Sequence, residues 1–223
     1  MKLKFSRNYT SFSISILLAG ILGILLSLTA CKTFDIKDKA DLLPYMLKPV
    51  AFMTIKSPKK LETVWPEMME VIEQRLRELP ALGKVTGIKE RKRKFAKNPK
   101  LRSQLRTYLS TLTLTGISDK ELAWKFEKEL ESPYFLLLDL ASFPCTQDCS
   151  SNEQWVIRLK LIEAQTGDLI FLVRKQHELA EEEKGAESYN ELAVKLTTEV
   201  VDEFASRFII PWHRWRYEHL RPA

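Results

Sequence analysis

The stretch WVIRLKLIEAQTGDLIFLVR, residues 155–174, decides the fold of this chain. From Trp155 to Leu161, apolar and polar side chains alternate, which is typical of a β-strand with one buried face. Residues 165–168, QTGD, favour a tight turn, and residues 169–174 follow as another mostly apolar run. The stretch therefore predicts a β-hairpin of two antiparallel strands.

Three segments before the hairpin also have the composition of strands. YFLLLDL, residues 134–140, is almost continuously apolar, so it is predicted to lie centrally in a sheet. PVAFMTI, residues 49–55, is a compact apolar run with β-branched residues, which indicates a second buried strand. Residues 82–88 are predicted to form a short further strand.

Helices are predicted where apolar side chains recur every three or four residues. Such a stripe runs from Trp65 to Leu79, and Pro80 ends it. Asn98 and Pro99 suit the start of another helix, because asparagine can cap backbone N–H groups and proline at the first position has no N–H to satisfy. A leucine stripe over residues 101–112 continues that helix.

Two capping boxes predict the last two helices. Ser118 with Glu121 would start one, and Ser188 with Glu191 would start a longer one. In each box the serine and the glutamate satisfy backbone N–H groups at the start of the helix. Pro211 is predicted to stop or kink the long helix.

Residues 1–30 have the architecture of an export signal. A basic start precedes an apolar stretch over residues 14–28, and small residues follow. The alternative is an uncleaved membrane helix, since residues 11–30 carry no charge and about twenty apolar residues can span a bilayer. Serines and glycines in that stretch dilute its hydrophobicity, which favours cleavage.

The last three residues of this segment and the next one, Leu28, Thr29, Ala30 and Cys31, resemble the lipobox of bacterial lipoproteins. The resemblance implies cleavage between Ala30 and Cys31 and attachment of diacylglycerol and an amide-linked acyl chain, such as palmitate, to Cys31. It also implies an address on the cell outer membrane, facing the periplasm of a Gram-negative host, because Lys32 rather than aspartate follows the cysteine. Two or more fatty chains hold a protein stably on a membrane.

These segments together predict an α+β fold, a mostly antiparallel sheet with helices packed on it, preceded by a cleaved signal peptide. Removing residues 1–30 leaves 193 residues, enough for one well-buried domain. That domain is predicted over residues 47–210, after a lipidated N-terminus and tether over residues 31–46. Residues 211–223 form an aromatic and basic C-terminal tail, suited to a membrane interface, to a protein-binding anchor or to packing back onto the domain.

Export also bears on Cys145 and Cys149. Paired thiols in an oxidising compartment usually form a disulfide, and this one would close so short a loop that it contributes only about 2 kcal/mol. Two free thiols are the alternative. No metal site is predicted, because the three histidines lie far away in the sequence and there is no second cysteine pair.

Residues 84–106 contain ten basic side chains against one acid, Glu90. The densest part is a run of four, Arg91, Lys92, Arg93 and Lys94. The run is either a solvated face or a contact with anionic lipid headgroups or an anionic polymer, where each basic residue contributes about 1 kcal/mol. The export segment holds three basic residues and no acid, so its removal lowers the formal charge from +6 to +3. A nucleic-acid partner is therefore not expected.

No catalytic constellation is evident, and motifs for a nucleophile elbow, a phosphate-binding loop or a zinc protease are absent from the sequence. Asp139 and His177 are the leading enzymatic candidates, although a hydrogen-bonded position explains Asp139 better. We therefore predict a non-enzymatic binding, assembly or regulatory lipoprotein of the envelope, with no cofactor. Its expected partners are membrane lipid through Cys31 and another envelope protein or an anionic envelope polymer. The alternative is a lipid-anchored hydrolase or transferase.

Four segments in the domain carry a further resemblance. They are residues 119–123, 132–137, 156–159 and 165–169. Their order resembles two related lipoprotein families, the penicillin-binding-protein activators and the curli-secretion channel proteins, which place a helix, an apolar strand and a strand pair joined through a Thr-Gly turn in that order. The resemblance implies the α+β fold for residues 48–208.

Overall fold

The computed structural model describes residues 34–38, 42–55, 61–62, 65–115, 117–144, 153–180, 183 and 186–219. The chain divides into two units, residues 1–33 and 34–223, and all described residues belong to the second. Several predicted features lie outside the described residues: the signal peptide, the lipobox with Cys31, and the pair Cys145 and Cys149.

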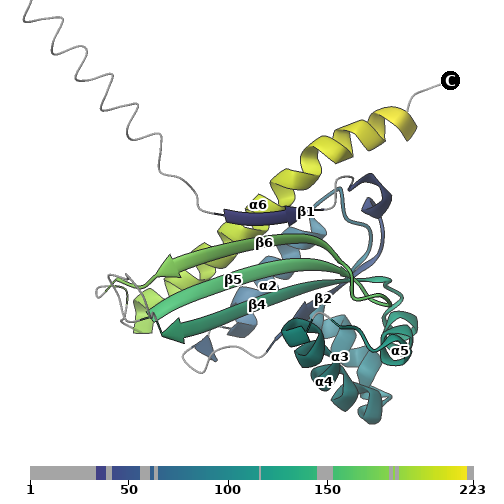
Figure 1. Ribbon diagram of the computed structural model, residues 1–223, viewed down its shortest axis with the longest axis horizontal. Coiled ribbons are helices and arrows are strands. Elements are labelled where there is room, and N and C mark those ends of the chain that lie inside the picture. The colour runs from purple at the N-terminus through teal and green to yellow at the C-terminus, as the bar shows by residue number, and fades with distance from the viewer. Residues whose placement is uncertain are drawn as a thin grey trace, which may run out of the picture. The chain divides into compact units, whose positions relative to one another are not determined.

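Six strands form one mixed sheet in the order β1-β6-β5-β4-β2-β3 (Figure 1). Their bounds are Phe34–Asp38 (β1), Val50–Thr54 (β2), Val85–Thr86 (β3), Tyr134–Pro144 (β4), Glu153–Glu163 (β5) and Leu169–Glu178 (β6). The pairs β1–β6, β6–β5 and β5–β4 are antiparallel, whereas β2 is parallel to both β4 and β3. The mostly antiparallel sheet, the hairpin β5–β6 and the interior position of β4 are as predicted from the sequence.

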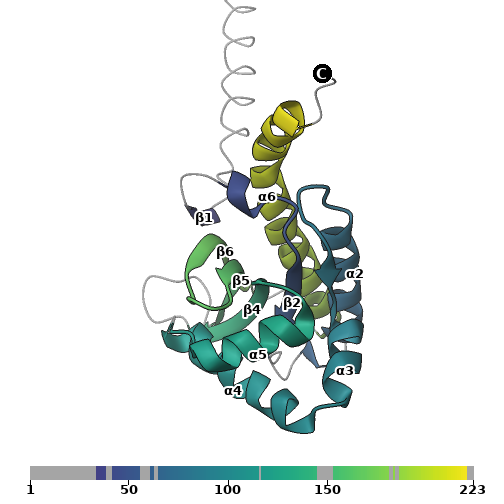
Figure 2. The same ribbon diagram turned by 90° about the vertical axis from the view of Figure 1, so that its right-hand side faces the viewer.

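Two helices cover one face of the sheet. They are α2 (Trp65–Arg77) and α6 (Ala186–His219), which Figure 2 shows together on one side of the strands. Their buried side chains form a core with alternate residues of the sheet, including Trp155, Ile157, Leu159 and Leu161 of β5. The apolar face predicted for this strand is therefore the face that these helices bury.

Three helices pack on the other face of the sheet, over β2 and the beginning of β4. They are α3 (Ile88–Ala96), α4 (Pro99–Thr115) and α5 (Lys120–Leu130), grouped at one end of the sheet in Figure 1. Phe126 of α5 is fully buried there, with its ring centroid 6.0 Å from that of Phe95 and 5.1 Å from that of Tyr108. Together with Phe135 and Leu137 of β4, these rings tie the helical layer to the sheet.

The predicted starts of two helices have different outcomes. The backbone N–H of Leu101 donates to Asn98 Oδ1 at 3.1 Å, so Asn98 caps α4 as predicted. In α5 the cap is Asp119, which accepts from the N–H groups of Glu121 and Leu122, and not Ser118. The hydroxyl of Ser118 instead donates to the carbonyl of Ala164 at 2.7 Å, so it is unavailable for the cap.

Two segments differ from the sequence-based boundaries. Residues 34–38, expected in the tether, form β1. The strand pairs with β6, and its Phe34 and Ile36 pack against the core that α2 and α6 form with the sheet. At the other end, α6 begins before Ser188 and continues through Pro211 to His219. Buried side chains such as Phe204 and Phe208 hold α6 on the sheet, so loss of one backbone donor at Pro211 does not end it.

Within the described part of the chain, no helix combines the length and the apolar character that crossing a bilayer requires.

Candidate anion-binding site

The candidate site lies at the carboxyl end of β2. From β2 the chain passes through α2 to β3, and from β3 it passes through α3, α4 and α5 back across β2 to β4. The first connection packs on one face of the sheet and the second on the other. In open α/β sheets, the point where connections diverge to opposite faces leaves a crevice at the carboxyl end of the strand, and ligands bind there.

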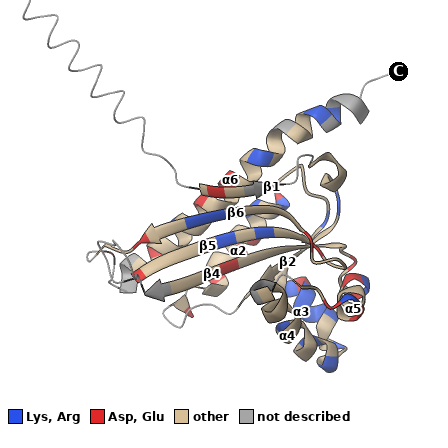
Figure 3. Cartoon of the chain, viewed as in Figure 1, with Lys and Arg blue, Asp and Glu red and all other residues tan. Residues whose placement is uncertain are grey.

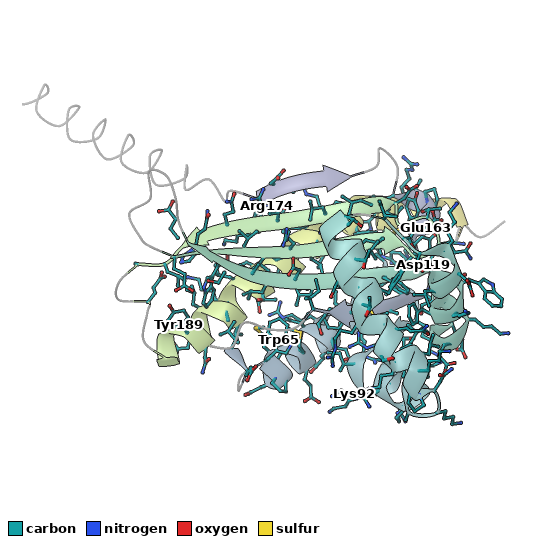
Figure 4. The ribbon with its side chains drawn as sticks, turned by 60° about the horizontal axis from the view of Figure 1, so that its bottom comes forward. Trp65, Lys92, Asp119, Glu163, Arg174 and Tyr189 are labelled. Atoms are coloured by element: carbon teal, nitrogen blue, oxygen red, sulfur yellow. The ribbon has the colours of Figure 1, made fainter. Side chains whose placement is uncertain are left out.

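A cavity of about 730 Å³ occupies this crevice. Its described lining comes from the end of β2, the segment leading into α2, α3 and α4: Thr54, Ile55, Glu62, Trp65, Arg91, Arg102, Leu105, Arg106, Leu109 and Ser110. Figure 4 views the side of the domain that carries the labelled Trp65 and Lys92. The volume is in the range of pockets that hold a small organic ligand, about 300–1,000 Å³.

The spacing of residues on α4 explains why apolar and basic groups meet in this cavity. Leu105 and Leu109 belong to the predicted leucine stripe and are buried against the sheet. Arg102 and Arg106 lie one turn apart beside that stripe, so both project at its exposed edge. Neither arginine forms an ion pair with any residue that the structure describes.

Arg91 is the one member of the basic run that turns inward. Its Nη1 donates to the carbonyl oxygen of Phe52 on β2 at 2.9 Å. Burial lowers the pKa of the Arg91 guanidinium from its ordinary value to about 10, although the negative charge of Glu73 opposes that shift. The group is still charged at pH 7, and it makes no ion pair within the described ranges. An anion in the cavity would therefore offset part of its burial cost.

Glu73 of α2 fixes the start of α3 and so places Arg91. Its carboxylate accepts the backbone N–H of Ile88 at 2.8 Å, at the first turn of α3. A Cβ atom at Gly87 would lie 1.8 Å from the same carboxylate, so only glycine allows this approach. α3 is thereby docked with Arg91 one turn into the helix, facing β2.

The structure divides the predicted run Arg91, Lys92, Arg93 and Lys94 among three environments. Arg91 lines the cavity, whereas Lys94 pairs with Glu131 at 3.1 Å, an interaction that lowers the pKa of Glu131. Lys92 and Arg93 are exposed, and among described residues they have no ion-pair partner. Figure 3 colours the Lys and Arg positions blue, and many of them lie along α3 and α4. The run is thus partly a solvated face and partly a cavity wall.

The two enzymatic candidates do not share a site. Asp139 is 6% exposed and forms an ion pair with Arg158, which lies opposite it on β5. His177 lies opposite Trp155 and contacts the carboxylate of Glu183 at 3.0 Å. Successive residues of a strand point to opposite faces, and Trp155 and Arg158 are an odd number of residues apart. Asp139 and His177 therefore project from opposite faces of the sheet.

Sequence reasoning did not single out most of the cavity. In the sequence, Trp65 begins the apolar stripe of a helix, and Arg102 and Arg106 belong to a larger set of basic residues. Thr54 and Ser110 carried no signal of their own. The signal that unites these residues is the strand order, which places the end of β2 between α2 and α4.

No protein-family model matches this chain, and no curated protein sequence matches it. Among solved structures, the PelC dodecamer from Paraburkholderia phytofirmans is similar at 10% sequence identity and a TM-score of 0.36, over 76% of this chain and 94% of the other. Lipoprotein GNA1162 from Neisseria meningitidis is similar at 8% identity and a TM-score of 0.40, over 70% of this chain and 99% of the other. Solved structures similar to this chain thus include a bacterial lipoprotein, and at these values the likeness assigns neither an activity nor a partner.

Proposed function

We propose that this protein is a lipid-anchored, non-enzymatic lipoprotein of the bacterial envelope that binds an anionic envelope component. The observation that carries the proposal is the arginine-lined cavity at the carboxyl end of β2. Three guanidinium groups and one carboxylate line it, so the wall is positive. The lipobox ending at Cys31 supports the anchor, with the outer membrane and its periplasmic side as the proposed address.

Binding rather than chemistry is favoured by what the cavity contains. Its described lining includes Glu62 as a carboxylate but no histidine, cysteine or lysine to act with it as a second acid or base. Arg102 and Arg106 carry guanidinium groups, which commonly bind phosphates and carboxylates. The component held could be an anionic polymer or an acidic group on another envelope protein.

Exposed basic residues beside the cavity would assist the first encounter. Lys92, Arg93 and Lys97 are exposed on α3 and at its end. Charges of one sign gathered around a cavity raise the local concentration of an anionic partner, and salt screens this attraction over about 10 Å at 0.1 M. The proposed binding should therefore weaken as ionic strength rises.

A charge-removal experiment tests the proposal. The full lipidated protein is placed in phosphatidylcholine nanodiscs and titrated with fluorescein-labelled dextran sulfate. We expect Arg102→Gln with Arg106→Gln to weaken binding about tenfold or more, since each charge-assisted hydrogen bond contributes about 1.5–3 kcal/mol. The melting temperature should hardly change, because both side chains are exposed.

The matched control removes two positive charges elsewhere. Lys48 and Lys120 are exposed, neither lines the cavity, and no ion pair with a described residue involves them. Lys48→Gln with Lys120→Gln should leave the affinity for dextran sulfate nearly unchanged. An equal loss in both double variants, or no loss in the arginine variant, would contradict a binding role for the cavity.

The non-enzymatic part of the proposal has its own test. We expect Asp139→Asn and His177→Gln proteins to complement a strain that lacks the gene, because the two groups lie on opposite faces of the sheet and cannot act together. Growth of the complemented strains is the measurement, and circular dichroism checks that each variant folds. A variant that folds, still binds dextran sulfate and yet fails to complement would instead favour the alternative of an envelope hydrolase or transferase.

A further inference from the structure

The basic residues in the described lining of the cavity at the carboxyl end of β2 are arginines and not lysines. Residues 84–106 supply six lysines and four arginines, but three of the arginines and none of the lysines line the cavity. A surface that needs only positive charge is served equally well by lysine. Arginine differs because its planar guanidinium donates two parallel hydrogen bonds to a phosphate or a carboxylate. The composition of the wall therefore indicates a shaped anionic group rather than a diffuse negative surface.

Arg91 is held in place before any ligand arrives. One of its five N–H donors is used by the carbonyl oxygen of Phe52, which fixes the guanidinium against β2, and the Sδ atom of Met53 lies 2.9 Å from the same nitrogen. The other two guanidinium nitrogens have no hydrogen-bond partner among the residues described. The guanidinium is therefore fixed at the cavity wall while some of its N–H groups remain available. Such a group is pre-organised to bind an oxygen-rich anion.

The number of positive groups in the cavity distinguishes a carboxylate ligand from a phosphate ligand. A carboxylate brings one charge and two oxygens, whereas a phosphate monoester brings a charge of about −1.5 to −2 at pH 7 and three strong acceptor oxygens. Three guanidinium groups on two different helices approach the cavity from different directions. Three positive groups therefore suit a phosphate monoester better than a carboxylate.

The other residues that line the cavity indicate which kind of chemical group is attached to the phosphate. The indole of Trp65 and the side chains of Ile55, Leu105 and Leu109 are apolar, and the hydroxyls of Thr54 and Ser110 can hydrogen bond. A cavity of about 730 Å³ is far larger than a phosphate ion requires. The space left over suits a neighbour with a flat or apolar face and a few hydroxyl groups, as in a sugar ring or a glycerol backbone.

We infer that this cavity recognises a phosphate monoester attached to a sugar or to a lipid glycerol, with the arginines on the phosphate and Trp65 against its neighbour. The inference rests on the proposed function and names the chemical class of its ligand. A soluble sugar phosphate and a phosphorylated lipid headgroup share this chemistry.

The test uses the full lipidated protein in phosphatidylcholine nanodiscs and follows tryptophan fluorescence and melting temperature. Soluble probes are glucose 1-phosphate and, as the carboxylate comparison, glucuronate. Lipid probes are nanodiscs that contain phosphatidic acid, a monoester, or phosphatidylglycerol, a diester, at equal mole fraction. We expect a higher melting temperature with glucose 1-phosphate or with phosphatidic acid than with the matched comparison probe. Whichever monoester stabilises the protein identifies the source, and stabilisation by neither would overturn the inference.

A charge-preserving variant separates this inference from the proposed function. Arg102→Lys with Arg106→Lys keeps both charges but removes the planar fork. We expect it to weaken binding of the stabilising monoester about tenfold, and to weaken binding of dextran sulfate less than the glutamine variant does. Unchanged monoester binding, or glucuronate binding as tight as that of glucose 1-phosphate, would refute the inference while leaving the proposed function intact. Failure of the glutamine variant to lose dextran sulfate binding would refute the proposed function itself.

Discussion

Replacing Cys31 with serine is expected to abolish incorporation of an alkyne-tagged fatty acid and to release the protein from the membrane fraction. The thiol of Cys31 is the proposed attachment point for diacylglycerol. Serine has no thiol, and with serine at this position the segment no longer matches the lipobox. Each buried methylene contributes about 0.8 kcal/mol to membrane binding, so loss of all the chains removes the anchor outright. In-gel fluorescence of labelled cells and fractionation by ultracentrifugation measure the two effects.

The same sequence offers a matched control for that experiment. A Cys145→Ser and Cys149→Ser double variant removes the other two cysteines of the chain and should label as strongly as the wild type. Retained labelling in the Cys31→Ser protein would show that lipid is attached elsewhere or not through a cysteine at all, and the assignment as a lipoprotein would then be lost.

Replacing Phe126 with alanine is expected to destabilise the domain by about 3–5 kcal/mol, because a buried aromatic side chain is lost and a cavity is left behind. Phe126 is fully buried between Phe95 and Tyr108, where α3, α4 and α5 meet. For a domain of this size, the melting temperature should fall by about 10 °C. Chemical denaturation followed by circular dichroism measures the free energy of unfolding.

Trp124 lies two residues before Phe126, on the opposite side of the same helix, and provides the comparison. Its side chain is 53% exposed, and the ammonium of Lys128 lies 5.3 Å from its ring centroid. Trp124→Ala should cost no more than about 1 kcal/mol, since it removes a surface cation–π contact and little buried area. Equal losses for the two variants would show that α5 is not held by the core we describe. Because the same core supports α4, binding at Arg102 and Arg106 should weaken only in the Phe126 variant.

Much of the fold could be predicted because its signals are local. The alternation in β5, the Thr-Gly turn and the cap at Asn98 each lie within a few neighbouring residues, and each is present in the structure. The start of α5 was placed one residue early, because sequence does not reveal that the hydroxyl of Ser118 is occupied by the distant carbonyl of Ala164. Local sequence patterns predict the start of a helix correctly only where no distant group competes for the capping side chain.

The candidate site could not be predicted, because it depends on strand order. Nothing in residues 50–55 or 99–110 indicates that β2 lies between β4 and β3, or that α4 passes the end of β2. The helix α3 was equally hidden, since Phe95 is its single fully buried side chain and the rest of it is largely charged. The inward turn of Arg91 follows from the docking of that helix against Glu73, which is a tertiary contact.

The strand β1 has a consequence for how this protein should be truncated. It pairs with β6 from Phe34 opposite Lys175 to Asp38 opposite Phe171, so it covers the backbone groups of an apolar strand. Its own outer edge belongs to the sequence FDIKD, in which three of five residues are charged. Charged, short edge strands discourage one protein's sheet from adding to another's. A recombinant fragment that begins after residue 38 would expose the edge of β6, and it should aggregate at concentrations where a fragment that begins at residue 32 stays monodisperse.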